Sequence, residues 1–280
     1  MKRIDTNTFG PWALVTGASS GIGKEFARQL AASGLNLVLV ARRLPLLEEI
    51  GRTLNDDYGI DYRAIALDLS QEDFLKRLEA STRDLDIGLV VSNAGTADPG
   101  EFLSSDPSVL HQKVRLSVLA HLDLAHHFGA KLATRGRGGM ILLSGMGASQ
   151  GVPYMANDSA TRAYVLTLGE TLNVELKKHH VNVTVLLPGP TQTALFDKIG
   201  FDARSTPFPP LTVEQTVSEG LAALSANRPS HLSGALYRIM NRLMPRSLFR
   251  EMNGSLILKV LTQKQKQAGP AVLTSGSHQE

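Results

Sequence analysis

The amino-acid sequence predicts an α/β fold: a single doubly wound parallel sheet with helices on both faces and a C-terminal helical cap. Three observations predict it, namely a glycine-rich turn between an apolar run and a helical pattern, a regular alternation of strand-like and helix-like segments, and polar or small residues where the apolar runs end. At 280 residues and 42% hydrophobic content, the chain can bury one large core. We expect one domain over residues 1–262, with the cap at about 200–262, and a disordered tail over 263–280.

The glycine-rich turn is Thr16–Gly23, which follows the apolar run Trp12–Val15 and precedes a helical pattern. A helix N-terminus placed directly after a strand presents backbone N–H groups to a pyrophosphate. Gly17 permits a sharp turn, Gly21 permits close approach of phosphate to the backbone, and Gly23 permits close packing of helix on strand. The turn therefore predicts a dinucleotide-binding site.

The alternation of elements follows from the spacing of the apolar residues. After the first helix, Leu35–Ala41 has few polar residues, which is typical of a parallel strand covered on both faces. Further strands are expected at 62–67, 87–91, 140–143 and 181–187, and helices at 45–54, 72–82, 109–134, 153–178 and 213–226. This order predicts that a ligand binds beyond the carboxyl ends of the strands.

Arg42 and Arg43 stand at the end of the second expected strand, where a dinucleotide fold places the adenosine ribose. Arginine favours the 2′-phosphate of NADP, whereas an acidic residue would favour NAD. Two solvated arginines in a loop are the alternative interpretation. The pair therefore predicts NADP rather than NAD.

Composition argues against several other functions. The chain has no cysteine, so it has no disulfide framework, thiolate metal site or cysteine nucleophile. His179 and His180 are expected to be solvated in a turn, so we expect no metal site. A net charge of +3 without a basic stripe argues against nucleic acid. Met1–Gly10 lacks the apolar core of a signal peptide, and no run approaches a span of about 20 residues, which predicts a cytoplasmic protein.

The C-terminal third is less regular. Pro207, Pro209 and Pro210 mark a loop, and Gly234–Leu261 is an amphipathic stretch with several basic residues. We expect this stretch to form a cap of helices over a substrate cleft. Attachment to a membrane surface is the less favoured alternative, because Pro245 interrupts the stretch and its charges are spread along it.

Taken together, these segments resemble the short-chain dehydrogenase/reductase family, in its hydroxysteroid and 3-ketoacyl reductase branch. The resemblance covers about 9–193 and rests on five separated elements in order. They are Thr16–Gly23, Val40–Arg43, Asp68, Asn93–Gly95 and Pro188–Thr193. The resemblance implies a Rossmann-type fold, NADP(H) as cofactor, a small, largely apolar substrate, and a homodimer or homotetramer.

The same resemblance implies the residues of the cofactor site. In the family the aspartate at Asp68 contacts adenine, and the loop at Pro188–Thr193 holds the nicotinamide carboxamide. Ser19, Ser20 and Arg42 are the expected phosphate ligands. The full expected set is Gly17, Ser19, Ser20, Gly21, Ile22, Gly23, Arg42, Arg43, Asp68, Leu69, Asn93, Ala94, Gly95, Arg162, Pro188, Gly189, Thr191 and Thr193.

The reaction centre departs from the family pattern at four positions. Aligned on the neighbouring motifs, the family's helix asparagine falls at Ser117, and its serine falls at Gly145, beside Ser144. The family's tyrosine falls at Asp158 and its lysine at Arg162. An aspartate near its reference pKa of about 3.9 is ionised at neutral pH and would repel the alkoxide that the tyrosine ordinarily protonates.

Asp158 and Arg162 are spaced i, i+4, so in a helix they share a face and can form an ion pair. The pair either fills the former tyrosine–lysine site or has a function of its own. In the second case Asp158 transfers a proton or stabilises a cation, and Arg162 binds the nicotinamide ribose or an anionic group. Tyr154, about one turn earlier, is a weaker substitute for the missing acid.

These residues lead to three hypotheses. The leading one is an atypical NADP(H)-binding enzyme that transfers hydride to an already activated C=N or C=C acceptor, or that catalyses non-redox proton transfer, cyclisation or lyase chemistry. The others are a catalytically silent NADP-binding scaffold or sensor, and a conventional carbonyl reductase with a relocated acid. The candidate catalytic residues are Asp158, Arg162, Ser144, Tyr154 and Ser117.

Overall fold

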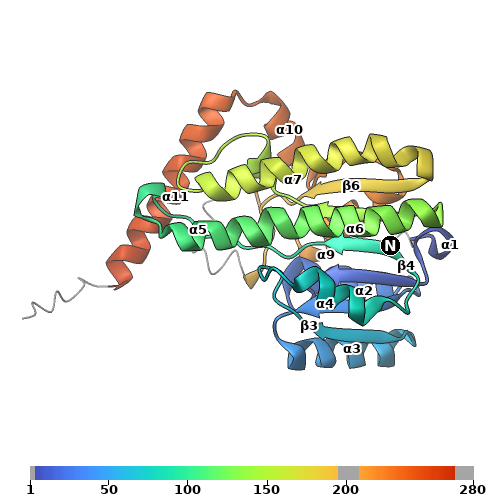
Figure 1. Ribbon diagram of the computed structural model, residues 1–280. Helices are drawn as coiled ribbons and strands as arrows, with labels where there is room; N and C mark the ends of the chain where they lie inside the picture. The colour runs from blue at the N-terminus through green and yellow to red at the C-terminus, as the bar shows by residue number, and fades with distance from the viewer. Residues whose placement is uncertain (1–3, 195–207, 269–280) are drawn as a thin grey trace, which may run out of the picture.

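The computed structural model describes residues 4–194 and 208–268, with the side chains of 264–268 left outside the description. Within these ranges the strands form one seven-stranded parallel sheet in the order β3-β2-β1-β4-β5-β6-β7 (Figure 1). The strands are β1 Trp12–Thr16, β2 Asn36–Ala41, β3 Tyr62–Ala66, β4 Ile87–Ser92, β5 Gly138–Leu143, β6 Val181–Leu187 and β7 Ser230–Leu232. The predicted doubly wound parallel sheet is confirmed.

Helices cover both faces of this sheet (Figure 1). One face packs against α2 Gly21–Ala31, α3 Leu44–Tyr58 and α9 Val213–Ser225. The other face packs against α4 Phe74–Thr82, α6 Ala120–Arg135 and α7 Ala156–Glu175. The remaining α-helices in the described ranges are α1 Thr6–Phe9, α5 Pro107–Val114, α10 Ala235–Leu243 and α11 Arg246–Ala268.

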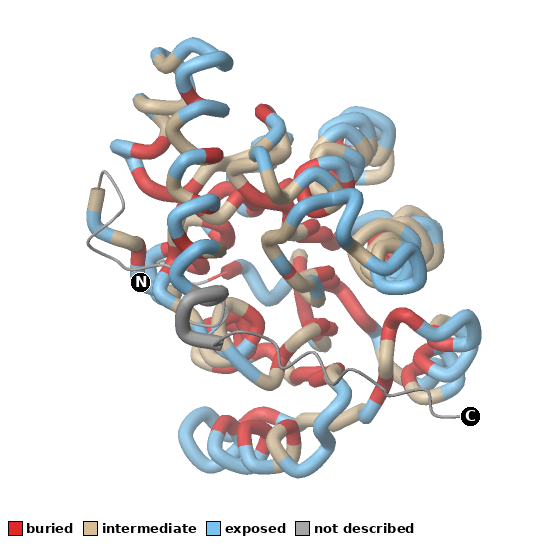
Figure 2. The backbone as a smooth tube through the Cα atoms, turned by 90° about the vertical axis from the view of Figure 1, so that its left-hand side faces the viewer, coloured by how far each residue is buried: buried red, intermediate tan, exposed pale blue. Residues whose placement is uncertain are grey.

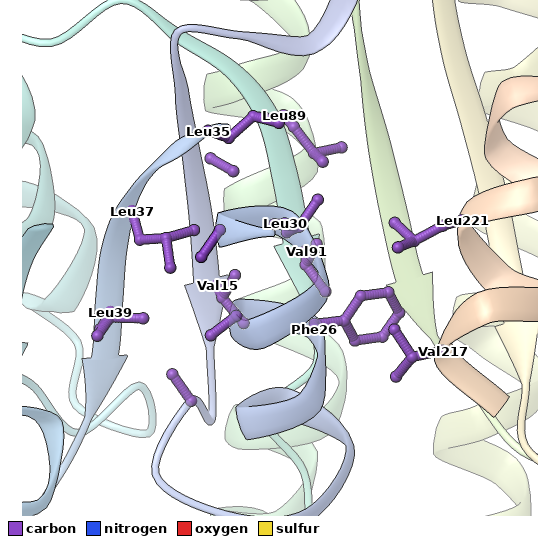
Figure 3. Close-up of a cluster of buried hydrophobic side chains, with 14 of the residues drawn as sticks. Val15, Phe26, Leu30, Leu35, Leu37, Leu39, Leu89, Val91, Val217 and Leu221 are labelled. Carbon is purple, nitrogen blue, oxygen red and sulfur yellow. The ribbon is translucent and has the colours of Figure 1, made fainter. Parts of the chain in front are cut away.

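The burial of the chain follows the two-sided sheet. Figure 2 shows buried segments running through the middle of the molecule and exposed residues on the outer sides of the surrounding helices. In the close-up of one cluster, the ring of Phe26 from α2 lies beside Val217 of α9, while Val15 and Val91 come from the central strands (Figure 3). Such a cluster stabilises the fold by removing apolar surface from water.

We expect Phe26→Ala to lower the free energy of unfolding by about 3–5 kcal/mol, because the substitution leaves a cavity in a close-packed core. Phe26 is fully buried, at 0% exposure. As a control, Leu103→Ala removes a side chain that is 95% exposed and is expected to change the free energy by less than about 0.5 kcal/mol. Urea denaturation measures both. A loss for Phe26→Ala no larger than that of the control would contradict the packing described.

Arg135, the last residue of α6, ties the N-terminal segment to the sheet. Its Nε donates to Asp86 Oδ1 at 2.8 Å, and its Nη1 donates to the carbonyl of Thr8 at 3.1 Å. Its Nη2 donates to the carbonyl of Gly10. Asp86 lies just before β4 and Gly10 just before β1, so Arg135 holds α1 at the amino ends of the central strands.

Two predicted elements differ from the structure in the middle of the chain. The single helix expected at 109–134 is divided into α5, the π-helical turn η2 (Arg115–Leu119) and α6. Gly138 and Gly139, expected to lie in the break after that helix, instead begin β5. A Cβ on Gly139 would lie 2.7 Å from the Phe9 ring, so a strand residue without a side chain is required there.

Other differences lie nearer the C-terminus. The helix expected from 153 begins at Ala156, and the three-residue strand β7 was not predicted. Helix α11 continues to Ala268, which is six residues into the stretch expected to form a tail, while 269–280 and Pro207 lie outside the described residues. None of the helices in the described ranges combines the length and apolarity needed to cross a bilayer.

Candidate active site

A cavity of about 1130 Å³ opens beyond the carboxyl ends of the strands, at the position expected from the topology. Every residue of the expected cofactor set lines it, from Gly17 in the first turn to Thr193 after β6. Ser117, Ser144, Asp158 and Arg162 line it as well. The structure therefore brings the expected cofactor residues and four of the five candidate catalytic residues to one cavity.

The glycine turn has the shape that the sequence predicted. Gly17 and Gly21 have φ values of +66° and +53°, in the left-handed region that favours glycine. A Cβ on Gly23 would lie 2.2 Å from the carbonyl oxygen of Gly17, so no side chain fits between α2 and the turn. The backbone of the turn is thus open to the cavity.

Asn93 and Thr16 hold this turn against the end of β4. The Asn93 amide donates from Nδ2 to the carbonyl of Thr16 at 2.8 Å. The backbone N–H groups of Asn93 and Ala94 donate to Thr16 Oγ1 at 2.9 and 3.0 Å. Thr16 is fully buried; it is the first residue of the glycine-rich segment but was not among the expected site residues. Asn93 thus positions the turn from the cavity wall.

The expected adenosine end of the cavity is polar. Arg42 and Arg43 are exposed, and Arg43 Nη2 donates to Ser19 Oγ at 3.4 Å, so its guanidinium lies over the glycine turn. Asp68 Oδ1 accepts from the backbone N–H and the hydroxyl of Ser70 at 2.9 and 2.7 Å. These contacts fix the Asp68 carboxylate at the end of β3 and place positive charge beside the turn.

Asp158 lies in the first turn of α7, with its side chain only 7% exposed. Burial raises the pKa of the Asp158 carboxyl above its ordinary value, against the opposing effects of Lys113 and Arg162. The expectation that Asp158 titrates near its reference pKa was therefore wrong. That expectation used the reference pKa of an aspartate in water, whereas burial disfavours the charged form of the Asp158 carboxyl.

Lys113 of α5 is the ion-pair partner of Asp158. Its Nζ lies 3.8 Å from Asp158 Oδ2 and 3.6 Å from Asp98 Oδ2, with the lysine side chain 11% exposed. Nζ also donates to the Asp98 carbonyl at 3.4 Å. Sequence reasoning missed Lys113. Lys113 lies four residues before Ser117, so the two share one face of a helix, and this spacing could have indicated that Lys113 faces the site.

The predicted Asp158–Arg162 ion pair is not formed in the described structure. Arg162 instead turns toward the end of β5, where Nη1 donates to the Ser144 carbonyl. Ser144 Oγ donates in return to the Arg162 carbonyl at 2.8 Å. Burial lowers the pKa of Arg162, while Asp158 raises it.

Gly145 makes room for this arrangement. A Cβ on Gly145 would lie 2.9 Å from both Cδ and Nη1 of Arg162. The guanidinium therefore occupies the space that a side chain at position 145 would need. The absence of a side chain at Gly145 and the position of the Arg162 guanidinium are therefore coupled.

The π-helical turn η2 carries Ser117, and His121 follows in α6. His121 is 3% exposed, and its Nδ1 lies 2.8 Å from Ser92 Oγ in a hydrogen bond. Burial, with a smaller effect of Arg162, lowers the pKa of His121 to about 4, so this imidazole is neutral at pH 7. His121 also lines the cavity and was not among the predicted residues.

Tyr154 is placed differently from the other candidates. It precedes α7 with a φ of +64°, and its carbonyl accepts the N–H of Gly100 at 2.8 Å. Unlike Asp158, Tyr154 is not among the residues that line the cavity. The position gives no geometric support to Tyr154 as the relocated acid.

The C-terminal helices close one side of the cavity. Its lining from α10 and α11 includes Tyr237, Met240, Met252, Leu256 and Ile257. The same two helices also contribute Asn253, Ser255 and Lys259, so this part of the lining is both apolar and polar. In the described ranges, no group of three or more His, Cys, Asp or Glu residues is arranged to hold a metal ion.

A family profile described as short chain dehydrogenase matches residues 11–203, which include strands β1 to β6. The chain belongs to the short-chain dehydrogenase family. The family predicted from the glycine turn and the strand-end motifs is therefore confirmed.

Two curated relatives of this short-chain dehydrogenase are named as a dehydrogenase and a reductase. This chain is 32% identical over 185 residues to a 7β-hydroxysteroid dehydrogenase from Clostridium sardiniense. The aligned region covers 66% of this chain and 71% of the relative. This chain is 33% identical over 220 residues to a very-long-chain 3-oxoacyl-CoA reductase from Podospora anserina, covering 69% of this chain. It spans only 64% of that relative's length.

Solved structures match this short-chain dehydrogenase over nearly its whole length. A 7β-hydroxysteroid dehydrogenase has a TM-score of 0.82 at 24% identity, covering 90% of this chain and 99% of the other, which shows the fold. A short-chain dehydrogenase from Sphingobium yanoikuyae in complex with NADPH has a TM-score of 0.75 at 27% identity. That match covers 94% of this chain and 99% of the other.

Proposed function

We propose that this short-chain dehydrogenase is an NADP(H)-dependent oxidoreductase of a small, largely apolar carbonyl compound or the corresponding alcohol. In this proposal the Asp158–Lys113 pair replaces the family's tyrosine as the source of the proton. The observation that carries the proposal is the burial of this ion pair on the cavity wall, with a raised pKa at Asp158. The names of the relatives, dehydrogenase and reductase, support the same class of reaction.

The residues of the cavity fit a dinucleotide phosphate. The backbone at Gly17 and Gly21 is open to it, and a Cβ at Gly23 would fill the space on which the turn depends. Arg43 beside Ser19 offers a cation and a hydroxyl for a 2′-phosphate. When bound there, NADPH would supply the hydride that reduces the carbonyl carbon.

Asp158 and Lys113 would hold and deliver the proton. As the carbonyl carbon receives hydride, the C=O π bond breaks and its electron pair goes to oxygen, which takes one proton from the pair. The pair is then short of one proton and regains it from water, which the 11% exposed Lys113 can reach. Because the two groups are coupled, the proton belongs to the pair rather than to either residue.

The raised pKa at Asp158 is the reason to propose carbonyl chemistry rather than only the activated acceptors favoured by the sequence. An ionised, isolated carboxylate would repel a developing alkoxide, whereas a protonated carboxyl, or the ammonium of the paired lysine, can donate a proton to it. Ser144 is a poorer acid, because its hydroxyl already donates to the Arg162 carbonyl. Arg162 would act as a positioning residue for the Ser144 loop.

Turnover assays with NADPH test the proposal against the two other hypotheses. We expect NADPH oxidation with small, largely apolar ketones, and NADP reduction with the matching alcohols. Turnover confined to cationic imines would favour an activated acceptor. NADPH binding without turnover of ketones, alcohols or imines would favour the scaffold. Either outcome would contradict the carbonyl reaction.

We expect Arg43→Ala to raise the Kd for NADPH by about tenfold, because one charge-assisted contact to the 2′-phosphate is lost. The Kd for NADH, which has no such phosphate, is expected to stay unchanged. The matched control is Arg52→Ala on α3, an exposed arginine that does not line the cavity. Fluorescence titration of NADPH and NADH measures both. An equal loss of affinity for the two dinucleotides would contradict the assignment of Arg43.

A further inference from the structure

Helix α10 turns its polar face toward the body of the protein. Arg238 donates from Nη1 to Glu219 Oε2 at 2.7 Å, an ion pair with a neighbouring helix. On the next turn, Asn241 Oδ1 accepts from Ser149 Oγ and Gln150 Nε2, each at 3.3 Å. Arg238 and Asn241 are therefore used for internal contacts rather than for solvation.

The apolar face of α10 points outward instead. Leu236 is 53% exposed, Ile239 55% and Leu243 74%. Their i, i+3, i+7 spacing places them on one side of the helix, which lies at the periphery of the molecule (Figure 1). We call these three side chains the α10 face. A helix with this orientation exposes its apolar surface to water unless another molecule binds to it.

Positive charge accompanies the α10 face. Residues 235–250 contain four arginines and no aspartate or glutamate. Arg238 is paired with Glu219, but Arg242, Arg246 and Arg250 are exposed, and no residue in the described ranges forms an ion pair with them. A binding partner that covers the α10 face should therefore offer an apolar surface with negative charge next to it.

An anionic lipid surface has this combination. An interfacial helix buries its apolar side chains at the boundary of headgroups and acyl chains, while arginines contact the lipid phosphates. A second copy of this chain on a two-fold axis would instead bring the same arginines together, with like charges opposed. We infer that α10, with the first turn of α11, docks on an anionic membrane surface.

The break at Pro245 favours this inference, although on the sequence alone it argued for a cap. The proline separates α10 from α11, so α10 is an amphipathic helix in its own right. Tyr237 and Met240, on the same helix, line the cavity. If the cavity takes an apolar substrate, a step that rests on the proposed function, docking places its wall beside the lipid phase.

Sedimentation of the full-length protein with vesicles tests the docking. We expect binding to vesicles of phosphatidylcholine and phosphatidylserine at 3:1, and little binding to pure phosphatidylcholine. Ile239→Ser with Leu243→Ser is expected to weaken binding at least about tenfold. Arg242→Gln and Arg246→Gln should each weaken it about fivefold, less so in high salt.

The control is Leu103→Ser with Val174→Ser, which removes side chains 95% and 70% exposed outside α10 and should leave vesicle binding unchanged. Circular dichroism checks that every variant is folded. Absence of binding to the anionic vesicles, or binding that the α10 variants leave intact, would overturn the inference. So would a dimer in light scattering that Leu243→Ser dissociates. Binding is measured without cofactor or substrate, so its outcome is separate from that of the proposed reaction.

Discussion

Asp158→Asn is expected to lower the turnover number for carbonyl reduction by about 100-fold or more, while the Kd for NADPH stays within about twofold. Asparagine keeps the size of the side chain, but it has no proton to give and no charge to pair with Lys113. Steady-state kinetics and fluorescence titration measure the two quantities. The matched control is Asp123→Asn on α6, outside the cavity, which should retain full turnover. Wild-type turnover in Asp158→Asn would eliminate this residue as part of the acid.

The pH dependence gives an independent check. Reduction needs the proton on the Asp158–Lys113 pair, so its rate should fall as pH rises through the pKa of the pair. Alcohol oxidation needs the pair without that proton, so its rate should rise over the same range. Because burial raises the pKa of Asp158, both changes should come at higher pH than an exposed aspartate would give. In the Asp158→Asn variant, neither rate should change with pH around this pKa.

Gly145→Ser is expected to lower the free energy of unfolding by about 1–3 kcal/mol, because its side chain has no room beside the partly buried Arg162. Adding Arg162→Lys should recover much of that loss, since lysine lacks the guanidinium that fills the space. Urea denaturation of the wild type, both single variants and the double variant gives the coupling energy. If the loss of unfolding free energy in the double variant equals the sum of the losses in the two single variants, positions 145 and 162 are independent.

Most of the fold could be predicted because its signals are local. The glycine turn and the apolar strand Leu35–Ala41 each specify one piece of a parallel sheet, and connectivity then fixes where the ligand cavity opens. Strand β7 has three half-buried residues, too few for a periodic pattern. The π-helical turn η2 was not predictable either, because its extra residue changes the backbone and leaves no side-chain pattern.

The site was predictable where it depends on strand ends and not where it depends on packing between helices. Ser144 and Asn93 follow directly from the ends of β5 and β4. Lys113 matters only because α5 packs against α7, a contact between distant segments. The spacing of Asp158 and Arg162 permits an ion pair, but the Ser144 carbonyl offers the guanidinium a partner that the spacing does not reveal.

The anchoring of α1 by Arg135 has a practical consequence for these experiments. Arg135 holds this segment at the edge of the sheet opposite the carboxyl ends where the cavity opens. A purification tag or a sensor-chip attachment at the N-terminus therefore leaves the cavity and the α10 face accessible. An attachment at the other end would follow α11, whose residues line the cavity. N-terminal immobilisation is accordingly the orientation of choice for measuring both dinucleotide and vesicle binding.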